Sequence, residues 1–299
     1  MSLNSNRIGL IDVDGHNGFP NLALMKLSAW HKSKGDQVEI YSPMFSGHMD
    51  IVYMSKVFTF TPDFEYFIDA DEIIRGGTGY KDYITQLSEE AEHIAPDYSI
   101  YPKVDYAIGF LTRGCIRKCP WCVVPKKEGT VQAYDTWQNI KRPDTNRILF
   151  LDNNILASDH GIRQIAELSK TDLKIDFNQG LDARLIDDTV AEILSRCKWD
   201  SFIRMSCDTS QMIDTVIGAI ERLQRHGVKP YKVFVYTLVQ DVTESHKRIL
   251  EISKTGAQPF AQPYRDFNGG EPTREQKRLA RWCNRKEIFN STSFEEYRR

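Results

Sequence analysis

The chain has 299 residues, a formal net charge of −2 and a hydrophobic share of 41%. That length allows one large domain or a large and a small one, and the near-neutral charge excludes a general attraction to nucleic acid or to anionic membranes. Every apolar run falls short of the roughly 20 residues that span a bilayer, and the N-terminus lacks the features of a signal peptide. We therefore expect a cytoplasmic protein with no membrane contact and no indicated nucleic-acid partner.

The first part of the chain alternates short strands with helical segments. Apolar patterns predict strands at residues 8–13, 38–41, 51–54 and 72–75. Leu24, Leu27 and Trp30 share one face of a predicted helix over residues 22–34, and another helix is expected over 80–93. Such alternation favours parallel strands with helices packed on the sheet.

The pattern breaks at residues 95–104, APDYSIYPKV, which carry two prolines and little helical periodicity. We place a domain boundary in this stretch. It predicts a small Rossmann-like α/β domain over residues 1–98 and a second domain over residues 99–299.

The second domain repeats a strand and a helix at a regular interval. Six strands are predicted, at residues 106–110, 147–151, 173–177, 201–205, 231–236 and 258–262. Five helices are predicted, at residues 159–169, 187–195, 211–226, 244–254 and 273–285. After a longer first interval the strands recur about every 26–30 residues, which suits one strand, one helix and two loops. Six such units are fewer than a closed barrel contains, so we predict a partial (β/α)6 barrel with a C-terminal helix and tail.

Three of the six cysteines lie together after the first strand of this series, in RGCIRKCPWC at residues 113–122. Cys115, Cys119 and Cys122 form a CxxxCxxC motif, and cytoplasmic thiols stay reduced and available to metals. A structural zinc site takes four closed ligands, and the chain has no second CxxC and no nearby His pair. The triad instead favours a [4Fe–4S] cluster with one iron left open. A metal-binding module without enzymatic activity is the alternative.

This motif, with Trp121 before its last cysteine, resembles the signature of radical S-adenosylmethionine (radical SAM) enzymes, and the resemblance covers about residues 104–285. It implies that the three cysteines hold a [4Fe–4S] cluster whose open iron binds the amino and carboxylate groups of S-adenosylmethionine. An electron from a donor such as flavodoxin or ferredoxin then cleaves the sulfonium, and the resulting 5′-deoxyadenosyl radical abstracts hydrogen from a substrate. The resemblance identifies neither the substrate nor a catalytic residue of this chain.

The resemblance also implies cofactor-binding residues near the cysteines. Trp121 would form a wall for the adenine or methionine part of S-adenosylmethionine. Asp152 and Asn153 end the second strand, where the family often has a Gly-Gly-Glu-like segment that touches the methionine amine. A helix cap explains an Asp-Asn-Asn sequence equally well, so both interpretations stay open.

Polar residues also follow the third and fourth strands of the series. Asn178 and Arg184 lie in FNQGLDAR, which gathers more polar groups than loop capping needs. Arg204 and Ser206 alternate in the fourth strand, so both side chains are expected on one face. An arginine inside a strand is costly unless it is paired, which favours a role for Arg204 at the ribose or carboxylate of the cofactor.

The N-terminal domain resembles a degenerate domain of the cobalamin-binding type. DGHNGF at residues 14–19 is similar to the Asp-x-His-x-x-Gly loop that ligates cobalt, and GGTG at residues 76–79 is similar to the loop that accepts the nucleotide tail. The glycine of the first loop falls one residue early, at Gly18, and a glycine-rich turn needs no ligand. We expect this domain to bind substrate or a partner, and a cobalamin-dependent radical SAM methylase is the alternative.

Overall fold

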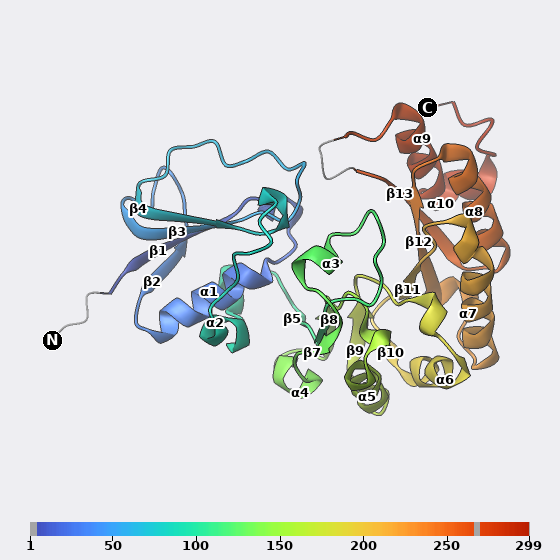
Figure 1. Ribbon diagram of the computed structural model, residues 1–299, viewed down its shortest axis with the longest axis horizontal. Helices are drawn as coiled ribbons and strands as arrows, with labels where there is room; N and C mark the ends of the chain where they lie inside the picture. Colours follow the sequence, from blue (N-terminus) through green and yellow to red (C-terminus); the bar gives the residue numbers. More distant parts are fainter. Residues whose placement is uncertain (1–4, 266–269, 299) are drawn as a thin grey trace. The chain divides into compact units, whose positions relative to one another are not determined.

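Parallel strands and helices alternate along most of the chain, which confirms the predicted α/β class (Figure 1). The computed structural model describes residues 5–265 and 270–298. The chain divides into two compact units, Met1–Asp105 and Tyr106–Arg299, whereas the sequence placed the boundary after residue 98. None of the helices in the described residues is both long and apolar enough to cross a membrane.

The first unit is built on a four-stranded parallel sheet with the strand order β2-β1-β3-β4. Its strands are β1 (Arg7–Asp12), β2 (Gln37–Ile40), β3 (Met49–Ser55) and β4 (Ala70–Gly76), which confirms all four predicted strands. The predicted helix is α1 (Leu22–Ser33), and it begins where the side chain of Asn21 accepts a hydrogen bond from the Leu24 N–H. One face of the sheet packs on α1, while loops cover the other face (Figure 1).

The helix predicted over residues 80–93 is wrong. A single 3-10 turn covers Thr78–Tyr80, and α2 (Glu89–His93) forms only the last part of the expected helix. Lys81 adopts a left-handed backbone with φ of 58°, which ends the turn. The carboxylate of Asp82 then accepts hydrogen bonds from the N–H groups two and three residues further on, at 2.8 and 3.0 Å, so it holds a local turn in place of a helix.

The second unit contains all six strands that its periodicity predicts. They are β5 (Ala107–Gly109), β8 (Arg147–Phe150), β9 (Lys174–Phe177), β11 (Ile203–Ser206), β12 (Val233–Val239) and β13 (Gln258–Pro263). They form two parallel sheets, β10-β9-β8-β5 and β11-β12-β13, where β10 (Lys198–Trp199) is a short addition. An isolated parallel bridge between Leu181 and Met205 joins the sheets. The parallel α/β class is therefore confirmed, and closure into a partial barrel stays a prediction.

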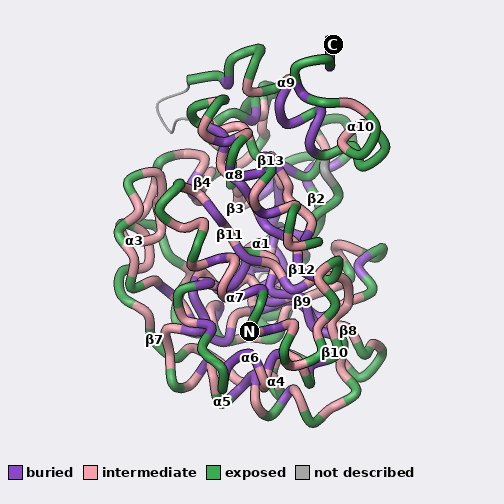
Figure 2. The backbone as a smooth tube through the Cα atoms, turned by 90° about the vertical axis from the view of Figure 1, so that its right-hand side faces the viewer, coloured by how far each residue is buried: buried purple, intermediate pink, exposed green. Residues whose placement is uncertain are grey.

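The five predicted helices of this unit are also present, as α5 (Asp159–Leu168), α6 (Asp188–Arg196), α7 (Ile213–Arg225), α8 (Val242–Lys254) and α9 (Arg274–Cys283). The sequence did not predict several short elements, namely β6 (Thr112–Arg113), α3 (Val124–Lys127), β7 (Gln132–Ala133), α4 (Trp137–Ile140) and α10 (Lys286–Ser291). Buried residues alternate with half-buried ones along both β11 and β12 (Figure 2). Along β12 buried residues such as Val235 alternate with half-buried ones such as Phe234, so one face of the strand lies in the core.

Arg248 ties α8 to two strand ends inside this core. Its side chain is 1% exposed, and it donates hydrogen bonds to the carbonyl oxygens of Cys207 and Leu238. Two further bonds of 2.7 Å reach the carboxylate of Glu244, one turn earlier on the helix. The guanidinium therefore satisfies backbone acceptors at the ends of β11 and β12.

We expect Arg248→Met to lower the free energy of unfolding by about 3 kcal/mol, because it leaves buried acceptors without donors. Urea denaturation measures this loss. The matched control is Arg196→Met, which breaks a Glu–Arg pair of the same spacing whose arginine is 63% exposed and whose glutamate is 46% exposed. That change should stay within about 0.5 kcal/mol of the wild type, and equal effects of the two substitutions would contradict the structural role of Arg248.

Candidate metal centre

The three clustered cysteines lie in a loop that an antiparallel strand pair holds at its base. β6 and β7 pair across the loop, and the N–H of Cys115 donates to the carbonyl of Gly129 at 3.1 Å. Gly114, directly before the first cysteine, has φ of +85°, and a Cβ there would lie 2.3 Å from the carbonyl oxygen of Thr130. Only glycine fits such a position, so the entry to the loop has a fixed backbone path.

Glu128 fastens both ends of this loop together. Its carboxylate accepts hydrogen bonds from the Gly114 N–H at 3.0 Å and from two nitrogens of Arg113 at 3.0 and 3.1 Å. The amide of Asn153 adds a bond of 2.5 Å from the end of β8. The sequence identified Asn153 as a cofactor residue but gave no signal for Glu128, and the structure places the two in contact.

Asp152 holds the backbone just before the loop. It is 1% exposed, and its carboxylate accepts hydrogen bonds from the N–H of Leu111 at 3.1 Å and from the N–H and hydroxyl of Thr112 at 2.6 and 2.7 Å. Burial raises the pKa of Asp152 to about 6, against the opposing effect of these hydrogen bonds. Its oxygens thus face the chain itself, and a direct contact with a cofactor stays a prediction.

Asp182 joins the cysteine loop to the ends of two strands. Its carboxylate accepts hydrogen bonds from Arg117 at 2.8 Å, from Asn154 at 3.2 Å and from Arg184 at 2.6 and 3.1 Å. Its side chain is only 5% exposed. Burial alone would raise the pKa of Asp182, but the hydrogen bonds from Arg184 and Arg117 outweigh burial and lower that pKa. Arg117 lies inside the CxxxCxxC motif, and the sequence did not single it out.

Asn154 brings a polar side chain next to the first cysteine. Its amide nitrogen lies 3.5 Å from the Sγ of Cys115, and the residue is 3% exposed. Its side-chain oxygen is buried without a hydrogen-bond partner among the residues that the structure describes. An unpartnered buried acceptor beside the thiols fits a donor group of a bound molecule.

All six cysteines are free, and the three of the loop are half-buried. Burial raises the pKa of the Cys119 thiol, while the nearby charge of Arg184 lowers it, and burial likewise raises the pKa of Cys122. Within residues 5–265 and 270–298, no group of three His, Cys, Asp or Glu side chains is arranged to hold a metal ion. The donor chemistry nevertheless fits a thiolate-bound metal, because three reduced thiols, cationic arginines and a buried acceptor occur together. Trp121 is half-buried in the same loop.

Arg204 and Ser206 lie on one face of β11, as predicted, because both are half-buried between buried neighbours. Arg204 pairs with Asp176 through bonds of 2.7 and 2.8 Å and also donates to the hydroxyl of Tyr236 at 3.2 Å. This pairing offsets the cost of placing a charge in the strand. Asn178 follows β9 and is half-buried, with its N–H bonded to the Phe150 carbonyl at 3.0 Å.

The glycine loop of the first unit packs against its own backbone. A Cβ on Gly77 would lie 2.4 Å from the carbonyl oxygen of Lys56, and one on Gly79 would lie 2.4 Å from the Cγ of the same lysine. Close packing therefore accounts for these glycines without a nucleotide tail. His16 is exposed, and Asp14 accepts hydrogen bonds from within the unit. Cobalamin binding stays an untested alternative.

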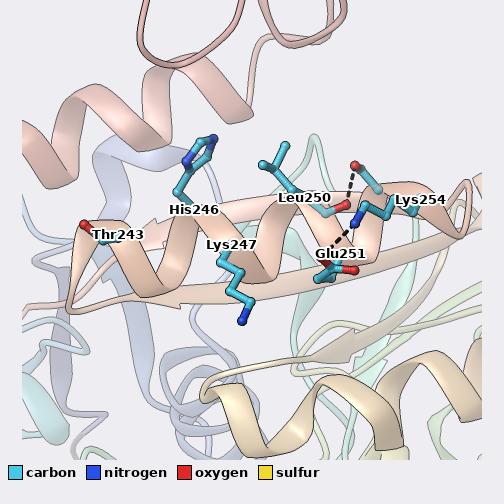
Figure 3. A pocket seen from close by; sticks show the side chains of 7 residues that line it. Thr243, His246, Lys247, Leu250, Glu251 and Lys254 are labelled. Carbon is cyan, nitrogen blue, oxygen red and sulfur yellow. Dashed lines mark hydrogen bonds and ion pairs between the residues drawn. The ribbon is translucent and has the colours of Figure 1, made fainter.

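A surface hollow along α8 is a separate feature (Figure 3). Its lining is Thr243, His246, Lys247, Leu250, Glu251, Ser253 and Lys254. All of these residues come from one helix, and Lys254 pairs with Glu251 at 2.8 Å. The hollow includes no residue of the cysteine loop. Among known proteins, no family model and no curated sequence matches the chain.

Proposed function

We propose that the chain is a radical SAM enzyme that cleaves S-adenosylmethionine reductively and acts on a substrate of undetermined class. The observation that carries this proposal is the CxxxCxxC triad of free thiols, placed in a loop directly after the first strand of a parallel βα series. Loops after the strand ends carry the chemistry in folds of this kind. Glu128, Asp152 and Asp182 fix the loop to the strand ends.

We also infer that the six main strands of the second unit form a partial (β/α)6 barrel. They pair in parallel and in chain order within each sheet, and a parallel bridge joins Leu181, which follows β9, to Met205 of β11. Helices between successive strands support the same arrangement.

The residues of the site fit the proposed cofactors by their chemistry. When bound, a [4Fe–4S] cluster supplies one electron and an iron open to S-adenosylmethionine. Cys115, Cys119 and Cys122 would hold it, and the free side-chain oxygen of Asn154 suits the ammonium group of the methionine part. Other proposed cofactor contacts are Trp121, Asn153, Asn178, Arg184, Arg204 and Ser206. Flavodoxin or ferredoxin would deliver the electron.

Anaerobic reconstitution with iron and sulfide tests the proposal. We expect a brown protein with close to four irons per chain, which releases 5′-deoxyadenosine from S-adenosylmethionine when dithionite is added. A chain that retains one zinc per molecule after reconstitution and shows no cluster absorbance would be a metal-binding module instead. Retention of hydroxocobalamin through gel filtration, and its loss in His16→Ala, would favour the methylase alternative.

A further inference from the structure

The carboxylate of Asp182 contacts the cysteine loop through Arg117, the end of β8 through Asn154 and the turn after β9 through Arg184. It holds two arginines, Arg117 from the loop and Arg184 from the turn after β9. Their side chains are 30% and 35% exposed, so each could turn into solvent without this carboxylate. Asn154 connects the same carboxylate to Cys115.

Asp182, Arg117 and Arg184 together carry one net positive charge beside the thiols, from two guanidinium groups and one carboxylate. Arg117 lies between Cys115 and Cys119 in the motif, and Arg184 shares its carboxylate with Asn154, whose amide nitrogen lies 3.5 Å from the Sγ of Cys115. A bound iron–sulfur cluster gains one negative charge when it is reduced. A cation held nearby stabilises the reduced form and so raises the midpoint potential.

We infer that Asp182 is a positioning residue of the metal centre, which holds Arg117 and Arg184 beside the cysteine loop so that their charge favours reduction of the bound cluster. This inference rests on the proposed function, because it needs the cluster. Asp182 itself contacts neither the cluster nor the substrate in this role. Asp182 affects the cluster only by holding the two arginines near it.

The sign of the change in potential separates positioning from the charge of Asp182 itself. If the arginines stay in place in Asp182→Asn, the local net charge rises from one to two and the midpoint potential rises. If they leave, the net charge falls to zero and the potential falls. Positioning therefore predicts that removal of a negative charge makes the cluster harder to reduce.

The experiment is an anaerobic redox titration of the reconstituted full chain, followed by electron paramagnetic resonance of the reduced cluster. We expect Asp182→Asn and Arg184→Gln each to lower the midpoint potential by about 59 mV, a tenfold change in the one-electron equilibrium. Arg184→Lys keeps the charge and should recover part of that shift. In the Arg184→Gln background, Asp182→Asn should leave the potential unchanged, because the net charge of these residues is zero both before the substitution and after Arg117 leaves.

The matched control is Asp200→Asn, which also breaks a two-bond pair with an arginine, Arg147, at 2.8 and 2.9 Å in the same unit. It should leave the midpoint potential unchanged. A cluster whose potential rises or stays constant in Asp182→Asn overturns the inference and leaves the proposed function intact. An unchanged potential in Arg184→Gln overturns it as well, even if Asp182→Asn fails to fold. A wild-type chain that takes up no cluster overturns both.

Discussion

Cys119→Ala is expected to abolish both the cluster absorbance and the release of 5′-deoxyadenosine. The proposed cluster needs three thiolates from the chain. Among the described residues, the loop contains no fourth cysteine that could replace Cys119. Cys119 is only half-buried, so alanine should not disturb the core. Iron content, absorbance after anaerobic reconstitution and chromatographic detection of 5′-deoxyadenosine measure the effect, and we expect all three to fall to background.

Cys197→Ala and Cys283→Ala are the matched controls for this substitution. Both cysteines are buried away from the triad loop, and burial raises the pKa of each thiol to about 12, so they stay protonated and inert. These variants should keep the full iron content and activity. The proposed function is wrong if Cys119→Ala reconstitutes the same cluster as the wild type.

Asp152→Ala is expected to lower the free energy of unfolding of the second unit by about 3–5 kcal/mol. The substitution leaves the N–H groups of Leu111 and Thr112 and the Thr112 hydroxyl buried without an acceptor, at roughly 1–3 kcal/mol for each group. Urea denaturation followed by tryptophan fluorescence suits the measurement, because the second unit holds Trp121, Trp137, Trp199 and Trp282.

A surface carboxylate of the same unit provides the comparison for Asp152. Asp172 is 92% exposed and pairs with the side chain of Lys198, so Asp172→Ala should change stability by less than about 0.5 kcal/mol. A loss below 1 kcal/mol in Asp152→Ala would show that water replaces the carboxylate. Asp152 would then be free for the cofactor role that the sequence suggested.

The regular part of the fold was accessible from the sequence because it depends on local patterns. Every predicted strand of both units is present, since short apolar runs between turns leave few other solutions. The helix over residues 80–93 failed because the apolar spacing looked helical, while Lys81 and Asp82 favour a turn through backbone and side-chain geometry. A turn that a single residue and one side chain stabilise leaves no periodic pattern in the sequence, so the apolar spacing did not reveal it.

The site was accessible only in part. The cysteine spacing located the loop, and Asp152 and Asn153 were placed at the correct strand end. Glu128 and Arg117 were missed, because each acts through partners 14 to 65 residues away, and no local pattern encodes such pairs. The polar residues of FNQGLDAR gave a signal for Asp182. Its partners Arg117 and Asn154 lie far away in the sequence, so only the folded structure identifies them.

The closeness of the three cysteines along the chain has a consequence for how metal binding and folding are linked. Cys115, Cys119 and Cys122 stay near one another in an unfolded chain as well, because the segments between them are short. An unfolded chain that also captures iron reduces the stabilisation that the ion gives to the native state. The folded loop differs from the unfolded segment by long-range contacts, such as that between Arg117 and Asp182. If the triad holds the proposed cluster, loading should raise the melting temperature by less than the affinity for iron implies, and iron could bind before the complete fold has formed.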